Sequence, residues 1–455
     1  MLYDRRDFGL LRLAGTHQWL PLAPLRALSS LKHLYREAEL LSTLGLLSFS
    51  RSNQYLMPSP EGYQFLASME IDCHAPTKRP YAQSSALRRR LEVGTVLLTC
   101  LGAGIEPAYD KVDRLKRQPV FLPAFALRGG DGNLMNAASC VGFGHWGNHA
   151  YLLQYVSRQN PGFFMNNELS HLYNLASVFS ERLDTPQALL LAGESYRSIY
   201  EMLSNQTPSG RNGKKGFTDY SQAYPRLGIP VSLVSCDDTG AMQLAIMRQM
   251  DYRTRIAQAA FGARWKPEDD RLPEADGHVD GNPLVIAVDM DLRRLERVCR
   301  DACQQGRREI LVAALEGQMS GLLLDQFPRR APVRALRINT QVLAAAFGEN
   351  FSAGDPWPDE PQGKVEVLYP AGAVLLVLLR NAHQLRPPGD QIYFQRDRRS
   401  GGLHLGRQPI PQSAGRLYPH RPGRHGSRLY PFLSHHQKGL HLVFRLQVYP
   451  GQTRL

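Results

Sequence analysis

Apolar residues recur at steps of three and four in three short stretches near the N-terminus, which is the spacing of one face of an α-helix. The pattern predicts helices over residues 7–14, 21–28 and 31–44. Gly15 and Thr16 are expected to end the first helix, and Ser29-Ser30 to cap the third. The side chains of the third helix that we expect to face a core are Leu34, Ala38, Leu41 and Leu44.

A hairpin and a further helix are predicted next. The first arm begins at Leu46-Leu47, the second covers residues 54–57, and Arg51-Ser52-Asn53 forms the tip. Ser59-Pro60-Glu61 then starts a helix with proline at its first helical position. This order of helices and hairpin is that of a winged helix-turn-helix, so residues 1–70 are predicted to be a DNA-binding domain of this kind.

Polar side chains occupy the positions that such a domain uses on DNA. A recognition helix places its N-terminal side chains in the major groove, and a cationic wing suits phosphate or the minor groove. Residues 1–70 contain seven Lys and Arg against six acids, so the basic positions are local and do not form a strongly basic face. The predicted partner is double-stranded DNA, and the open alternative is a module of the same build that binds protein. The candidate DNA-binding residues are Lys32, His33, Tyr35, Arg36, Arg51 and Asn53.

Residues 71–118 are predicted to contain a linker and a basic helix. Ser84-Ser85 caps a helix that runs to about Gly102, with Arg88, Arg89 and Arg90 in its first two turns. Cations at that end oppose the helix dipole, so their presence needs another reason. Contact with DNA phosphate is one reason, and a solvated basic face is the other.

Between residues 119 and 390, short apolar runs alternate with helical patterns, which indicates an α/β domain. The fold class expected for the chain is therefore α/β, with a mainly parallel sheet covered by helices after the winged helix. Residues 264–282 are acidic and contain proline, so we expect a mobile loop there. The predicted strands cover residues 120–127, 151–157, 163–165, 188–191, 231–235, 284–288 and 310–314.

The N-terminal pattern also resembles a known family. The segments REAELLSTLGLL and LMPSPEGYQFL look like the winged helix of bacterial and mobile-element regulators, in which a helix ending in Gly-Leu-Leu leads into a wing and a Thr-Pro-x-Gly helix. With an Arg-rich helix and an α/β region following, the chain resembles the replication-relaxation proteins of plasmids and conjugative elements. This resemblance implies a DNA-binding protein that acts in replication, transfer or its regulation, with other mobile-element proteins as possible partners.

The net charge of +13 belongs almost entirely to the last part of the chain. Residues 391–455 contain eleven Lys and Arg against one acid, Asp397, so the first 390 residues carry only +3. One interpretation is a basic arm with interleaved aromatic residues that wraps nucleic acid. The other is a shift of reading frame in a GC-rich gene, which replaces acids by Arg, Pro, Gly and His. We favour the second, and it predicts a disordered basic tail.

Carboxylates that follow predicted strands are the candidates for catalysis, because open α/β sheets hold their sites at the carboxyl ends of strands. Convergent carboxylates would bind magnesium and activate water for phosphodiester cleavage, so the alternative function is a metal-dependent nuclease. The Glu-x-Lys triplet expected of a restriction-enzyme core is missing, and Lys364-Val365-Glu366 has the reverse order. Acids after strands are also ordinary helix caps. The catalytic candidates are Glu168, Asp289 and Asp291, and Asp237, Asp238 and Glu316 occupy similar places.

Other chemistry has little support in the sequence. The glycine-rich segment 210–216 lacks the Ser or Thr that follows the lysine of a phosphate loop. The six cysteines are scattered without a Cys-x-x-Cys pair, so buried free thiols are expected and no metal site. No cofactor is predicted unless the nuclease alternative holds.

The longest apolar run, residues 371–379, is too short to cross a bilayer, and charges at residues 4–7 interrupt any signal peptide. A cytoplasmic location without membrane contact is therefore expected.

Overall fold

The structure is a computed structural model of the 455-residue chain, which divides into two compact units. The larger unit comprises Leu10–Ala67 and Asp72–Pro358, and the other comprises Met1–Gly9, Ser68–Ile71 and Asp359–Leu455. The residues that the structure describes are 9–71, 73, 84–108, 119–126, 140–147, 149–157, 186–204, 229–267, 272–307, 309–321, 333–349, 351 and, as backbone, 365–368, 374–377, 390–396 and 403–409.

The N-terminal module, residues 9–68, is built around small leucine-rich helices and a short sheet. Its three strands are hydrogen-bonded in the order β1-β3-β2, and both pairs are antiparallel. Leu10, Leu25, Leu34 and Leu56 are fully buried, so the core is formed by helices and sheet together. The elements are α1 (Gly9–His17), β1 (Leu20–Pro21), α2 (Leu22–Ala27), the 3-10 helix η1 (Ser29–Leu31), α3 (Lys32–Thr43), β2 (Leu47–Phe49), β3 (Tyr55–Pro58) and α4 (Pro60–Ser68).

Two expected helix signals in this module are wrong. Gly15 and Thr16 do not end α1, which continues to His17. A Cβ on Gly15 would lie 2.5 Å from Leu66 Cδ1, so this glycine allows close packing of α1 against α4. Ser29 and Ser30 do not cap α3 either, because they form η1, and the N-cap residue of α3 is Leu31.

A six-stranded sheet follows, with its strands in chain order. The pairs β4–β5, β7–β8 and β8–β9 are parallel, whereas β5–β6 and β6–β7 are antiparallel. The strands are β4 (Glu106–Pro107), β5 (Val120–Pro123), β6 (Cys140–Trp146), β7 (His149–Tyr155), β8 (Gln187–Gly193) and β9 (Val231–Ser235).

A five-stranded sheet holds the remaining strands of the larger unit, again in chain order. β12, β13 and β14 are parallel to one another, and β10, β11 and β12 pair antiparallel. The α/β class is therefore as predicted, but the parallel strands are divided between two mixed sheets instead of forming one mainly parallel sheet. The strands are β10 (Trp265–Lys266), β11 (His278–Val279), β12 (Asn282–Ile286), β13 (Ile310–Leu315) and β14 (Val333–Ile338).

Strand β13, which pairs with β12 and β14, contributes residues to two apolar clusters, one on each of its faces. Ile310, Val312 and Ala314 pack in one apolar cluster with β5–β9 and α11, while the alternate residues of β13 pack in a second cluster with α10 and α13. The helices of this region are α7 (Tyr196–Ser204), α9 (Asp238–Met247), α10 (Tyr252–Phe261), α11 (Leu292–Gln304), α12 (Glu316–Gly321) and α13 (Thr340–Phe347).

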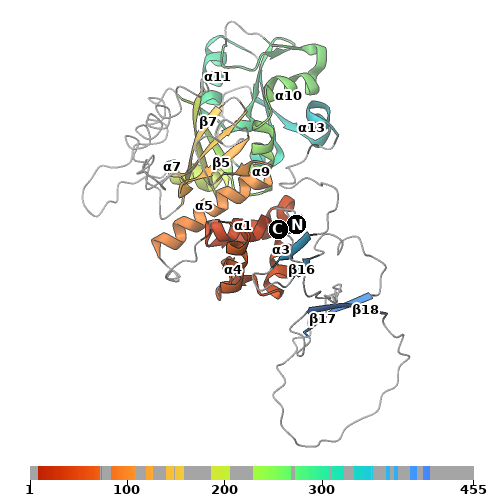
Figure 1. Cartoon of the computed structure of the whole chain (residues 1–455). Helices are drawn as coiled ribbons and strands as arrows, with labels where there is room; N and C mark the ends of the chain where they lie inside the picture. The colour runs from red at the N-terminus through yellow and green to blue at the C-terminus, as the bar shows by residue number, and fades with distance from the viewer. Residues whose placement is uncertain are drawn as a thin grey trace, which may run out of the picture. The chain divides into compact units, whose positions relative to one another are not determined.

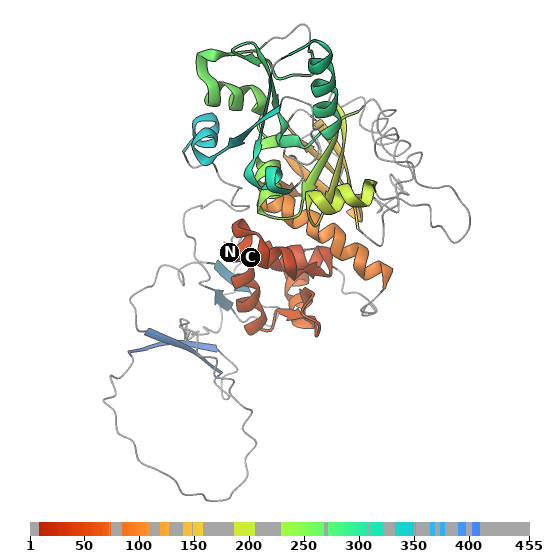
Figure 2. The same ribbon diagram turned by 180° about the vertical axis from the view of Figure 1, so that it is seen from behind.

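Helix α5 (Ser85–Gly102) lies between the N-terminal module and the sheets in both ribbon views (Figures 1 and 2). It begins where the sequence predicts, since the Ser84 hydroxyl accepts a hydrogen bond from the Leu87 N–H at 3.2 Å. It contacts β1 and α2 on the module and β4, β6 and α9 in the α/β part. Its buried residues from Val93 to Gly102 therefore join the module to the α/β core.

The mobile loop predicted at residues 264–282 differs from the structure, and one strand was not predicted. The described residues of the predicted loop 264–282 contain β10 and β11, and the carboxylate of Asp276 accepts a hydrogen bond from the Ile286 N–H at 2.6 Å. Strand β6, which contains two glycines, was not predicted, and all its residues are buried. A Cβ on Gly144 would lie 1.9 Å from the Trp146 ring, so glycine here makes room for the indole. The predicted strand 163–165 lies outside the described residues.

The smaller unit contributes two described strand pairs. β15 (Val365–Leu368) pairs with β16 (Val374–Val377), and β17 (Asp390–Arg396) pairs with β18 (Leu403–Pro409), both antiparallel. β17 and β18 fall in the part of the chain that we expected to be a disordered tail, so the structure differs from that expectation over these two strands. The rest of residues 391–455 lies outside the described residues.

Candidate functional site

Helix α3 presents polar side chains from its first two turns. Lys32, His33 and Arg36 are exposed and Tyr35 is half-buried, while Leu34, Ala38 and Leu41 are buried. Leu44, which we expected in the core, is half-buried. The amphipathic pattern of α3 thus leaves the candidate groove contacts accessible on one surface.

Arg26, in the last turn of α2, extends this surface. Its Nη2 donates to the Tyr35 hydroxyl at 3.2 Å, and its guanidinium carbon lies 5.2 Å from the centre of the Tyr35 ring. A cation held over an aromatic ring is placed more firmly than a freely rotating one. Arg26 was not among the sequence-predicted candidates, although its position shortly before the third helix is visible in the sequence.

The hairpin tip lies between β2 and β3, as predicted. Residues 51–54 are exposed, and Asn53 has a positive φ of 55°. The turn is tied by Ser50, whose hydroxyl accepts from the Gln54 N–H at 2.9 Å and whose carbonyl accepts from the Asn53 N–H at 2.8 Å. Arg51 and Asn53 therefore project from a fixed turn.

Arg88, Arg89 and Arg90, near the start of α5, are half-buried and contact other residues of the chain. Arg88 lies 3.9 Å from the Glu92 carboxylate, and Arg89 donates to the Cys140 carbonyl at 3.2 Å. The Arg90 guanidinium carbon lies 4.5 Å from the centre of the Phe125 ring. Arg89 and Arg90 therefore contact residues outside α5, whereas the Arg88–Glu92 pair lies within the helix.

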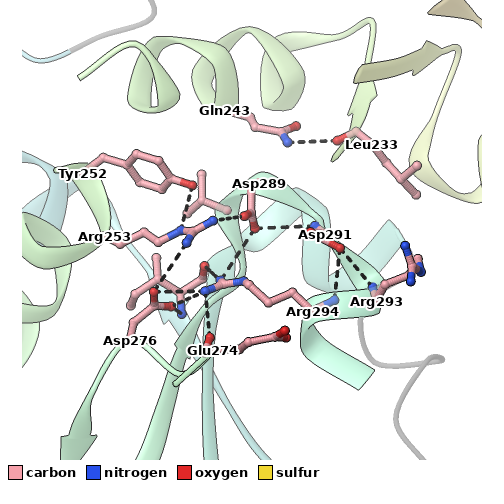
Figure 3. A network of polar contacts seen from close by, with 12 residues as sticks. Leu233, Gln243, Tyr252, Arg253, Glu274, Asp276, Asp289, Asp291, Arg293 and Arg294 are labelled. Atoms are coloured by element: carbon pink, nitrogen blue, oxygen red, sulfur yellow. Dashed lines mark hydrogen bonds and ion pairs between the residues drawn. The ribbon is translucent and has the colours of Figure 1, made fainter. Parts of the chain in front are cut away.

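A second polar cluster, the Asp289 network, lies where η6 (Ala287–Asp289) meets α10 and α11 (Figure 3). Arg253 donates from Nη2 to Asp289 Oδ2 and from Nε to the Tyr252 hydroxyl at 3.1 Å. Arg294 Nη2 lies 3.9 Å from Asp289 Oδ1. The Asp289 side chain is 6% exposed, so two guanidinium groups neutralise a buried carboxylate.

Arg294 joins this network to the β10–β12 region. Its Nη1 donates to the Glu274 carbonyl at 3.2 Å and to Asp276 Oδ1 at 3.0 Å, and its Nη2 donates to the Ile286 carbonyl at 2.8 Å. Arg294 is 9% exposed on its side chain. Asp291 has a separate task, because its carboxylate caps α11 by accepting from the N–H groups of Arg293 and Arg294 at 3.2 and 3.0 Å.

The pKa values of the Asp289 and Asp291 carboxyl groups are shifted in opposite directions. Burial opposes the charged form of Asp289, but Arg253 and Arg294 outweigh it and hold the pKa of that carboxyl below its usual value. Burial raises the pKa of Asp291, and the neighbouring Asp289 charge raises it further. Burial and then Arg253 lower the pKa of His149, which lies at the start of β7.

The catalytic candidates are placed as follows. Asp289 is paired with Arg253, Asp291 caps a helix, and Glu168 lies outside the described residues. Among the residues that the structure describes, no group of three or more His, Cys, Asp or Glu is arranged to hold a metal ion. Sequence reasoning missed Arg253, Asp276 and Arg294. A signal for Arg294 existed, since it falls on the apolar face of α11 beside Leu295 and Val298.

Comparisons of the chain with protein-family models, with curated proteins and with solved structures found no match. In the described part of the chain, no helix has both the length and the apolar character needed to span a membrane.

Proposed function

We propose that the N-terminal module is a winged helix that binds double-stranded DNA, with α3 in the major groove and the β2–β3 hairpin as the wing. The observation that carries the proposal is the common exposure of Lys32, His33 and Arg36 on α3, next to a tied hairpin tip that exposes Arg51. The order of helices and the β1-β3-β2 sheet support it.

The chemistry of these side chains suits the two kinds of contact that DNA offers. Arginine and lysine bind phosphate and the acceptor edge of guanine, and histidine and tyrosine offer further hydrogen-bonding groups. Arg26, held on Tyr35, adds a cation beside the same surface. From the resemblance to replication-relaxation proteins, we infer that the bound DNA belongs to a plasmid or other mobile element and that binding serves replication, transfer or its regulation.

The test is fluorescence anisotropy of the full chain with a labelled duplex from the gene's own neighbourhood and one of random sequence. The double variant Lys32→Ala/Arg36→Ala is expected to bind the first duplex at least about tenfold more weakly, with a salt dependence shallower by about 0.9 for each phosphate that the variant no longer neutralises. The matched control, Arg300→Ala/Arg334→Ala, removes two exposed cations from α11 and β14 and is expected to stay within about twofold of the wild type.

Equal losses of affinity in the two double variants would mean that α3 has no special part in binding and that only net charge matters. If the wild-type chain binds neither duplex while remaining folded by circular dichroism, the module does not bind DNA, and a protein partner becomes the better assignment.

A further inference from the structure

Two hydrogen bonds join Ser29, in the 3-10 helix η1 before α3, to Asp238 in the α/β region. The Ser29 N–H donates to Asp238 Oδ1 at 2.6 Å, and the Ser29 hydroxyl donates to Asp238 Oδ2 at 2.6 Å. Both residues are exposed, and 209 positions separate them in the chain. A single carboxylate thus occupies two hydrogen-bond donors of one serine.

Asp238 is not needed as the cap of its own helix. The N-cap of α9 is Asp237, whose Oδ1 accepts from the Gly240 N–H at 3.0 Å and from the Ser235 hydroxyl at 2.6 Å. The neighbouring carboxylate of Asp238 points instead to Ser29. Asp237 therefore caps α9, whereas the adjacent Asp238 bonds to the N-terminal module.

Packing around α5 holds the two partners together. A Cβ on Gly102 would lie 2.8 Å from Ser30 Oγ and 3.8 Å from Ala241 Cβ, so η1 and α9 meet at the same point of α5. α5 also contacts both α2 and α9. The Ser29–Asp238 contact is thus supported by close packing on either side of it.

The contact lies beside the proposed DNA-binding surface. Ser29 precedes Lys32 by three positions, and the exposed residues His33 and Arg36 follow. A backbone N–H and a serine hydroxyl are donors that proteins commonly offer to DNA phosphate. With Asp238 in place, both donors are occupied, and the carboxylate charge beside them repels a phosphate.

We propose that Asp238 is an autoinhibitory contact, in which a carboxylate of the α/β region occupies the Ser29 donors and restrains binding of DNA phosphate at the start of α3. This inference rests on the proposed function and adds its regulation. Loss of the Asp238 contact frees the serine and removes the opposing charge, so this contact lowers the affinity of the start of α3 for DNA.

The test compares full-length variants in duplex binding at low and high salt. Asp238→Asn is expected to bind random duplex about three- to tenfold more tightly than the wild type at about 50 mM salt, and the gain should shrink at about 300 mM because exposed charges are screened. Asp301→Asn removes a half-exposed acid from α11 and should change affinity by less than about twofold. Asp238→Ser serves as a second charge-removing variant if the first one unfolds.

A further variant distinguishes competition for Ser29 from a change in net charge alone. Adding Ser29→Ala to Asp238→Asn should remove about half or more of the gain, because the freed hydroxyl is then no longer available to phosphate. If Asp238→Asn and Asp238→Ser bind no more tightly than the wild type, while Lys32→Ala/Arg36→Ala still weakens binding, the autoinhibition is wrong and the proposed function stands. If no variant binds duplex, the proposed function has failed and the inference falls with it.

Discussion

At the scale of single residues, the Arg294 guanidinium holds the Asp289 network together. It bonds to Asp276 and to two backbone carbonyls, and it is almost fully buried. Replacing it by methionine keeps much of the side-chain volume but leaves the Asp276 carboxylate without its main cation. We therefore expect Arg294→Met to lower the free energy of unfolding by about 3–5 kcal/mol, measured by urea denaturation of the full chain.

Arg297 provides the matched control on the same helix. Its side chain is 41% exposed, and it pairs with the Glu274 carboxylate at 2.8 Å. Because solvent screens this pair, Arg297→Met should cost less than about 1 kcal/mol. Similar destabilisation by the two substitutions would contradict the idea that burial of the Arg294 contacts is what makes the network important for stability.

At the scale of elements, prediction from sequence succeeded where the signal is local. β9 has the predicted bounds, and α5 starts at its serine cap, because a short apolar run and a cap are properties of neighbouring residues. β10 and β11 were missed because short polar strands are defined by their partners. The Asp289 network was missed because Arg253, Asp276 and Arg294 come from separate segments. Exposure of Lys32 and Arg36 was predictable from the periodicity of α3.

Strand β6 shows how a packing constraint can hide an element from sequence reasoning. Gly144 leaves space for the fully buried Trp146, which stacks on Tyr151 with ring centres 4.6 Å apart. Gly144→Ala places a methyl group against the indole, and we expect it to lower the free energy of unfolding by about 1–3 kcal/mol. Thermal or urea unfolding of the full chain measures the change.

A double-mutant cycle identifies the indole as the cause. In a Trp146→Leu background the ring is gone, so Gly144→Ala should cost at least about 1 kcal/mol less than it does in the wild type. The same cost in both backgrounds would mean that the alanine disturbs the strand itself and that the glycine has no special relation to Trp146.

At the scale of the whole molecule, charge and candidate site lie in different parts of the chain. The C-terminal segment 391–455 carries most of the net charge of +13, whereas the proposed DNA-binding surface depends on a few cations of the N-terminal module. Long-range attraction by an arginine-rich segment is independent of DNA sequence, because it acts on phosphates through release of counterions. Experiments should therefore distinguish binding through the C-terminal arginines from the binding proposed for the N-terminal module.

We expect replacement of Arg416, Arg421, Arg424 and Arg428 by glutamine to weaken binding of the full chain to random duplex and to reduce the salt slope by up to about 0.9 for each phosphate that these arginines neutralise. The affinity for the duplex from the gene's own neighbourhood, divided by that for the random duplex, should rise, since the contacts proposed for α3 are untouched. Unchanged binding to both duplexes would mean that these arginines take no part, which fits a frame-shifted origin of the basic composition. A fall in selectivity would instead assign base recognition to residues after 390 and remove it from α3.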